Sequence, residues 1–280
     1  MKIGMNLWTV YGWSLPERPG DRVLGALSQL GIDAVEIVVD EELNSAEQLL
    51  KHQDEVKAAL ARHNLTVPTV ASALFWRYNL GSKREDVREG GIAIIEGMCR
   101  VARSYGAKTI LVVAGQQESH TPFALTWDNA VRAIRRAAKT AEELDILIGV
   151  ENVGSNFLNS PGEMARFIAD VDHPNVGCYL DLGNAMFVLN GYPENWCTAL
   201  AGKIVAVHVK DYVKKSRELV YCGEGDLPWA GVLPVLRECG YDDYLMVETP
   251  DEEKKGDIDA GLDAARRSVN GIRPFVEALG

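Results

Sequence analysis

Four ionisable residues lie directly after apolar runs in the second half of the chain. They are Glu151, Asp181, His208 and Glu248. Burying an isolated charge in such a position is costly unless the charge is paired. Three carboxylates brought together repel one another, whereas with an imidazole they form a suitable ligand set for a divalent cation. The residues therefore predict a metal site with oxygen ligands and one nitrogen ligand.

Such a ligand set leaves positions of an octahedral ion open for water or for two oxygens of a sugar. We expect one divalent ion, with Mn²⁺ favoured and Mg²⁺, Co²⁺ or Zn²⁺ as alternatives. Each residue alone also has an ordinary structural interpretation. Glu151 would then cap a loop or form half of an ion pair, and His208 would be a hydrogen-bonded core residue. Their recurrence on consecutive predicted strands favours one shared metal over four separate explanations.

The elements that must position these residues alternate between strand-like and helix-like stretches. Eight runs rich in Val, Ile and Leu are nearly continuously apolar, which is typical of parallel strands covered on both faces. We place the strands at Ile3–Trp8, Ala34–Val38, Thr66–Ala71, Thr109–Ala114, Leu147–Asn152, Gly177–Leu182, Ile204–Lys210 and Leu245–Thr249. Amphipathic stretches between them predict helices, among them Ala46–His63, Glu85–Tyr105, Trp127–Leu144, Pro161–Ala169 and Pro228–Cys239.

Eight strand–helix units in a chain of this length predict an α/β fold, a single (β/α)8 TIM barrel that forms one domain over residues 1–280. A doubly wound open sheet is the competing fold, but the segment after the first strand lacks the G-x-G-x-x-G fingerprint. In a TIM barrel the strands lie about 4.8 Å apart and their carboxyl ends share one mouth. We therefore expect the four strand-end residues to converge there.

Composition and charge narrow the range of functions. The 280 residues include 29 Lys plus Arg against 40 Asp plus Glu, a formal net charge of −11, which argues against a duplex-binding surface. No apolar run approaches the roughly 20 residues of a membrane-spanning helix, and the N-terminus is expected to begin a strand rather than a signal peptide. Five scattered cysteines without a C-x-x-C pair fit the reduced thiols of a cytoplasmic protein.

Further candidates lie near the expected mouth. Glu36, within the second strand, is either a substrate contact or the partner of a Lys or Arg at the rim. Trp8 and Trp76 follow the first and third strands, where their rings either wall a sugar pocket or pack at the rim. His120, in the loop after the fourth strand, is either a substrate ligand or a solvated loop residue.

The order of several short motifs resembles the xylose isomerase-like TIM-barrel superfamily. The motifs are E-N after the fifth strand, D-x-G-N after the sixth, H-V-K-D on the seventh, G-E-G-D-L-P-W before the seventh helix and V-E-T on the eighth. That superfamily includes ketose 3-epimerases, sugar-phosphate isomerases and epimerases, inosose dehydratases and type IV apurinic endonucleases.

By matching position, the resemblance implies that the four strand-end residues are the metal ligands. It also implies that Glu151 and Glu248 are the acid–base pair and that Arg217 contacts substrate oxygens. Many ketose 3-epimerases carry a His three residues after the sixth-strand Asp, where this chain has Asn184. An amide hydrogen-bonds a hydroxyl but does not carry protons as an imidazole does, so Asn184 is expected to bind substrate.

We therefore expect a sugar or sugar-phosphate isomerase or epimerase that abstracts a proton next to a carbonyl through a metal-stabilised enediolate. The alternative is a lyase or dehydratase that uses the same site on a keto-sugar, keto-inositol or 3-keto-glycoside. The endonuclease interpretation needs additional His ligands, and with Asn184 and only five His in the chain these are largely missing. The expected partners are a small carbohydrate and, as the resemblance implies, further copies of the chain in a dimer or tetramer, with no nucleic acid and no membrane.

Overall fold

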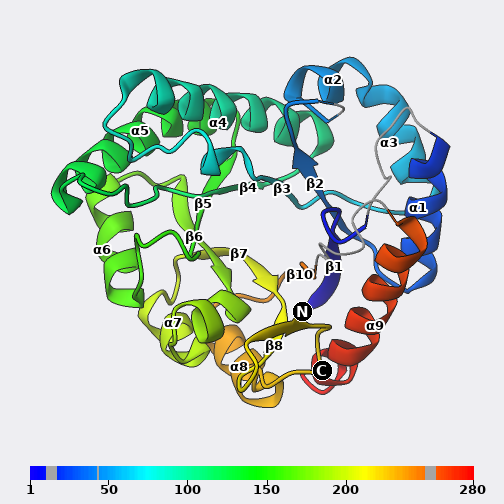
Figure 1. Ribbon diagram of the computed structural model, residues 1–280. Helices are drawn as coiled ribbons and strands as arrows, with labels where there is room; N and C mark the ends of the chain where they lie inside the picture. Colours follow the sequence, from blue (N-terminus) through cyan, green and yellow to red (C-terminus); the bar gives the residue numbers. More distant parts are fainter. Residues whose placement is uncertain (11–17, 43, 250–256) are drawn as a thin grey trace.

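The apolar strands close into a barrel (Figure 1). The structure is a computed structural model that describes residues 1–10, 18–42, 44–249 and 257–280. The barrel strands are β1 (Lys2–Asn6), β2 (Val35–Val39), β3 (Thr69–Ser72), β4 (Thr109–Val112), β5 (Leu147–Glu151), β6 (Val176–Asp181), β7 (Ile204–Val209) and β10 (Tyr244–Val247). All pair in parallel, and β1 closes the ring by pairing with both β2 and β10. The (β/α)8 TIM barrel predicted from the sequence is confirmed.

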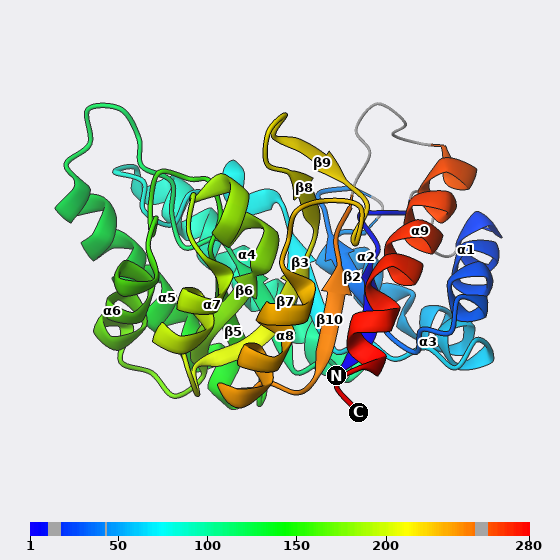
Figure 2. The same cartoon turned by 90° about the horizontal axis from the view of Figure 1, so that it is seen from below.

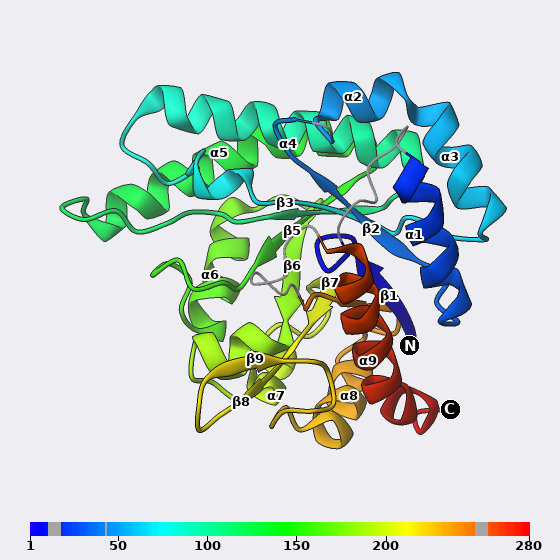
Figure 3. The same cartoon turned by 45° about the vertical axis from the view of Figure 1, so that its right-hand side comes forward.

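Helices surround the strands on the outside of the barrel (Figures 1 and 3). They are α1 (Arg18–Gln29), α2 (Ala46–Lys51), α3 (Gln53–Arg62), α4 (Glu85–Tyr105), α5 (Phe123–Glu143), α6 (Pro161–Val171), α7 (Pro193–Ala199), α8 (Trp229–Glu238) and α9 (Ile258–Glu277). The last helix, α9, packs against α1 and β1, so the two ends of the described chain meet (Figure 3). Among the described residues, none of the helices combines the length and the apolar character needed to cross a bilayer.

Two of the predicted helices differ most from their expected bounds. The stretch 46–63 bends at His52, whose ψ of 17° separates α2 from α3 although its backbone N–H still bonds the Gln48 carbonyl. Helix α5 begins at Phe123 rather than at Trp127 because aromatic contacts hold its first turn. The Phe123 ring lies 5.9 Å from that of Trp127 and 5.5 Å from that of Phe157.

Burial of the strands on both faces explains their continuous apolar character. Every residue of β3, β4 and β6 is buried, because the barrel interior covers one face and the helices cover the other. Local capping signals mark the ends of two helices. Gly106, at a φ of 78°, terminates α4, and the Ser160 hydroxyl accepts the Glu163 N–H at the start of α6.

An antiparallel hairpin that the sequence did not predict follows β7. Its strands are β8 (Asp211–Val213) and β9 (Glu218–Val220), and it projects from the end of the barrel opposite the two termini (Figure 2). The Asp211 carboxylate anchors it by accepting the backbone N–H groups of residues 212, 223, 225 and 227 and the Trp229 indole N–H. A Cβ on Gly225 would lie 2.3 Å from Asp211 Oδ1, so this loop requires glycine there.

Candidate metal centre at the mouth of the barrel

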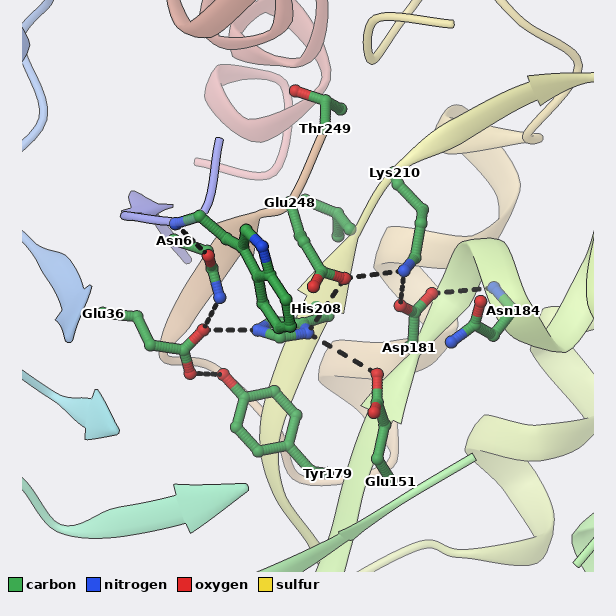
Figure 4. A network of polar contacts seen from close by, with 12 residues as sticks. Asn6, Glu36, Glu151, Tyr179, Asp181, Asn184, His208, Lys210, Glu248 and Thr249 are labelled. Atoms are coloured by element: carbon green, nitrogen blue, oxygen red, sulfur yellow. Dashed lines mark hydrogen bonds and ion pairs between the residues drawn. The ribbon is translucent and has the colours of Figure 1, made fainter. Parts of the chain in front are cut away.

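Four strand ends bring the predicted ligands to one point (Figure 4). Glu151 and Asp181 are the last residues of β5 and β6, His208 lies in β7, and Glu248 directly follows β10. These strands are neighbours in the barrel, and Asp181 is paired in register with His208. One possible ligand atom from each residue lies within 4.8 Å of all the others. The sequence analysis therefore identified side chains that the fold does bring together.

Burial and neighbouring charges give the carboxyl groups different pKa values. Burial raises the pKa of Glu151 to about 7, and the nearby Glu248 carboxylate adds to the rise. Burial also raises the pKa of Asp181, although the Lys210 ammonium opposes that shift. For Glu248 the burial effect is outweighed by Lys210 and His208, which lower its pKa to about 2. Glu151 thus holds a proton at neutral pH more readily than Glu248 does.

The four side chains fit a divalent cation. His208 Nδ1 lies 3.7 Å from Glu151 Oε1 and 3.5 Å from Glu248 Oε2. Within the part of the chain that the structure describes, this buried nitrogen has no hydrogen-bond partner. A buried imidazole nitrogen together with the carboxylate oxygens that it faces forms a set of atoms suited to ligate a divalent metal ion.

Lys210 directly follows β7 and is a cation to which the sequence analysis assigned no role at this site. Its Nζ lies 2.9 Å from Asp181 Oδ2 and 2.6 Å from Glu248 Oε2. Burial lowers the pKa of the Lys210 ammonium, but these two carboxylates outweigh burial and hold the pKa well above its usual value. A Cβ on Gly183 would lie 2.4 Å from Lys210 Cγ, so only glycine lets the lysine lie across Asp181.

A cavity of about 210 Å³ opens beside the four ligands. Trp8 and Trp76 line it, as do Glu151, His208, Lys210 and Glu248. Asn184 also lines it, at the start of the π-helical turn η2 (Asn184–Val188) that follows β6. The Asn184 backbone N–H donates to Asp181 Oδ1 at 2.7 Å, and its buried Nδ2 has no partner among the described residues. Its amide is therefore free to bond a ligand.

Besides Asp181, which lies among the four ligands, three predicted site residues do not line this cavity. Glu36 is fully buried inside the barrel, where its carboxylate bonds His208 and no Lys or Arg among the described residues. Arg217 lies in the turn between β8 and β9, and its guanidinium donates to the Phe187 carbonyl at 3.0 Å. His120 is exposed in the loop between β4 and α5. The structure thus places Arg217 against η2 instead of in the cavity, because the unforeseen hairpin carries it there.

Several supporting residues were not singled out from the sequence. Asn152 accepts the Asp181 N–H at 2.7 Å and donates to the Asp181 carbonyl at 2.9 Å, which fixes the backbone of that ligand. Asn6 and Tyr179 contact Glu36 inside the barrel. One feature of the sequence could have identified them: each is a polar residue within or directly after an apolar strand. A polar side chain that is buried in such a place needs a hydrogen-bond partner.

Comparison with known proteins places the chain among sugar-converting enzymes. A sequence model of the family described as "Xylose isomerase-like TIM barrel" matches residues 24–273. The chain is 24% identical over 251 residues to a putative L-ribulose-5-phosphate 3-epimerase, SgbU, of Escherichia coli strain K12, and the match covers 86% of each chain.

Solved structures share the fold at low sequence identity. The D-psicose 3-epimerase of Clostridium cellulolyticum H10, solved with D-tagatose, has a TM-score of 0.79 at 20% identity over 99% of both chains. The IOLI protein, solved with a bound zinc atom, has a TM-score of 0.78 at 20% identity over 99% of both chains.

Proposed function

The chain belongs to the xylose isomerase-like TIM-barrel family, and from that premise we propose that it is a sugar isomerase or epimerase that requires a divalent metal ion. It is an enzyme of the isomerase and epimerase type, like the relatives described above. One observation carries the proposal: Glu151, Asp181, His208 and Glu248 converge beside a small cavity.

The proposed ligands of the metal are those four residues, each contributing one oxygen or nitrogen atom. Mn²⁺ is the ion we propose, because three carboxylates and one imidazole suit it and leave positions for substrate oxygens. When bound, a divalent ion supplies Lewis acidity, which stabilises the negative charge that develops on a substrate oxygen as a neighbouring C–H proton leaves. The zinc atom in the IOLI protein supports a divalent ion in this fold.

Glu151 and Glu248 are the proposed acid–base pair. They come from β5 and from the end of β10, and both line the cavity. One carboxylate removes the proton next to the substrate carbonyl, and the other returns a proton to the opposite face, which inverts that carbon. A raised pKa of about 7 suits Glu151 to proton exchange near neutral pH.

A small carbohydrate fits the rest of the cavity. The volume of the cavity is about 210 Å³, which is smaller than the roughly 300–1,000 Å³ of pockets that bind drug-sized ligands. The rings of Trp8 and Trp76 offer apolar faces for the C–H side of a sugar, and the Asn184 amide offers a donor to a hydroxyl. The net charge of −11 further favours a sugar over duplex nucleic acid.

Deuterium exchange tests the proposal before the true substrate is known. Free and phosphorylated ketoses are incubated with the enzyme and Mn²⁺ in D₂O, and carbon-bound deuterium is measured by NMR. We expect exchange with at least one sugar, its loss with a chelator and its return with Mn²⁺. Exchange that survives complete removal of metal, or no exchange with any sugar, would contradict the proposal. An unsaturated product would instead support the lyase.

A further inference from the structure

A buried carboxylate lies behind the metal centre, on the far side of His208. Glu36 comes from β2 and is 0% exposed. Its Oε2 lies 2.6 Å from His208 Nε2, and its Oε1 accepts the Tyr179 hydroxyl at 2.6 Å (Figure 4). Asn6 Nδ2 also donates to Oε2. A carboxylate held here by three groups from three other strands has a defined orientation.

The surrounding hydrogen bonds determine which imidazole nitrogen carries the proton. The backbone N–H of Trp8 can only donate, and it donates to Asn6 Oδ1 at 2.6 Å. The other end of the Asn6 amide is therefore NH₂ and donates to Glu36 Oε2, which makes that oxygen an acceptor. His208 Nε2 contacts the same oxygen and must then be the donor.

The opposite nitrogen of the ring is consequently directed at the ligands. His208 Nδ1 faces Glu151 and Glu248, and among the described residues it has no hydrogen-bond partner. The Tyr179 ring lies 4.5 Å from the imidazole, centroid to centroid, and packs against it. With Nε2–H bonded to Glu36, the lone pair of Nδ1 is the one that remains for an ion.

We propose that Glu36 is a positioning residue that holds His208 with Nε2 protonated and Nδ1 aimed at the metal. The role rests on the proposed metal centre. It gives Glu36 a function different from substrate contact, because its carboxylate lies behind the ligand and does not line the cavity. A carboxylate bonded to a ligating imidazole fixes the ring orientation and makes the imidazole a stronger ligand, so its loss is expected to weaken metal binding by about 10–100-fold.

Two matched variants test this role. Glu36→Gln preserves size and one acceptor oxygen but removes the negative charge that His208 Nε2–H contacts. Tyr179→Phe removes a different hydrogen bond to the same carboxylate and leaves the Glu36–His208 contact and the aromatic ring in place. The Zn²⁺ affinity of each variant is measured by calorimetry. The free energy of unfolding is measured by urea denaturation in the presence of a chelator. NMR of ¹⁵N-histidine-labelled, Zn²⁺-loaded protein reports which ring nitrogen is protonated and how strongly its N–H is hydrogen-bonded, and the chain has only five His.

We expect Glu36→Gln to bind Zn²⁺ about 10–100-fold more weakly and to shift the Nε2–H proton signal of His208 upfield, because an amide oxygen is a weaker acceptor than a carboxylate. Tyr179→Phe should lower stability while keeping both the Zn²⁺ affinity, within about threefold, and the Nε2–H signal. Equal loss of Zn²⁺ affinity in the two variants, or an unchanged His208 signal in Glu36→Gln, would overturn the role. Failure of the wild-type protein to bind Zn²⁺ or Mn²⁺ would instead refute the metal centre itself.

Discussion

Lys210 and Glu248 form an ion pair at the mouth of the barrel, with Lys210 Nζ 2.6 Å from Glu248 Oε2. The same ammonium lies 2.9 Å from Asp181 Oδ2. Two of the four proposed metal ligands thus already contact a cation supplied by the chain. This arrangement compensates part of the negative charge when no metal is bound, and a divalent ion must compete with it.

Lys210→Met should therefore raise the affinity for Mn²⁺ by at least roughly tenfold, because the competing cation and its repulsion of the ion are removed. The metal-free variant should unfold at a lower temperature than wild type, since its carboxylates lose their partner. Calorimetry with Mn²⁺ and thermal unfolding in chelator provide the two measurements. Lys108→Met, which removes an exposed lysine paired with Asp145, is the control and should change neither. Unchanged affinity in Lys210→Met would show that the ammonium does not compete.

Glu151→Gln and Glu248→Gln should each lower turnover by about 10²–10⁴-fold, because the amide keeps a ligand oxygen but cannot transfer a proton. If the two carboxylates act on opposite faces of the substrate, one variant should retain deuterium exchange while net conversion is lost. Asp181→Asn should reduce metal content and exchange together. Exchange, turnover and metal content are measured on the same samples. Near-normal turnover in both Gln variants with metal bound would assign the proton transfers to other residues.

The stability of the metal-free protein should fall as pH rises from about 5 to about 8. Glu151 has a pKa of about 7 in the folded chain against an ordinary value of 4.5, so between these values the folded state binds more protons than the unfolded state. Its ionisation costs up to about 3 kcal/mol over that range. The raised pKa of Asp181 acts in the same direction. Urea unfolding in chelator at several pH values measures the slope.

Glu151→Gln is the control for that pH dependence. The variant should show a flatter decline than wild type, because it lacks the group that titrates. Glu248, whose pKa is about 2, is ionised in both states near neutral pH and should not contribute to the slope there. A wild-type slope equal to that of the variant would mean that Glu151 ionises at its ordinary pKa.

Asp211→Asn should lower the free energy of unfolding by at least about 2 kcal/mol, because an NH₂ group replaces an oxygen that accepts buried N–H donors. Asp226→Asn is the matched control. Asp226 accepts one exposed backbone N–H, from Lys214, and its replacement should cost less than about 1 kcal/mol. Urea denaturation measures the free energy of unfolding of both variants. Equal values for Asp211→Asn and Asp226→Asn would show that Asp211 does not anchor the hairpin.

The sequence by itself determined the barrel and its four converging side chains. Eight apolar runs alternating with amphipathic stretches are compatible with few folds, and parallel strands in a barrel all end at one mouth. A residue such as Glu151 or Asp181, at the end of a buried strand, is therefore placed in space by its position in the sequence alone. No neighbouring side chain has to be known for that inference.

Only the tertiary structure decided which group each of the other polar residues contacts. Glu36 and His208 are 172 residues apart, and strand periodicity does not reveal that two strands across the barrel direct these side chains at each other. The hairpin that carries Arg217 depends on one carboxylate, Asp211, binding donors 12 to 18 residues further along the chain. Such contacts depend on distances and directions within the closed barrel, whereas local patterns record only propensity and the order of the elements.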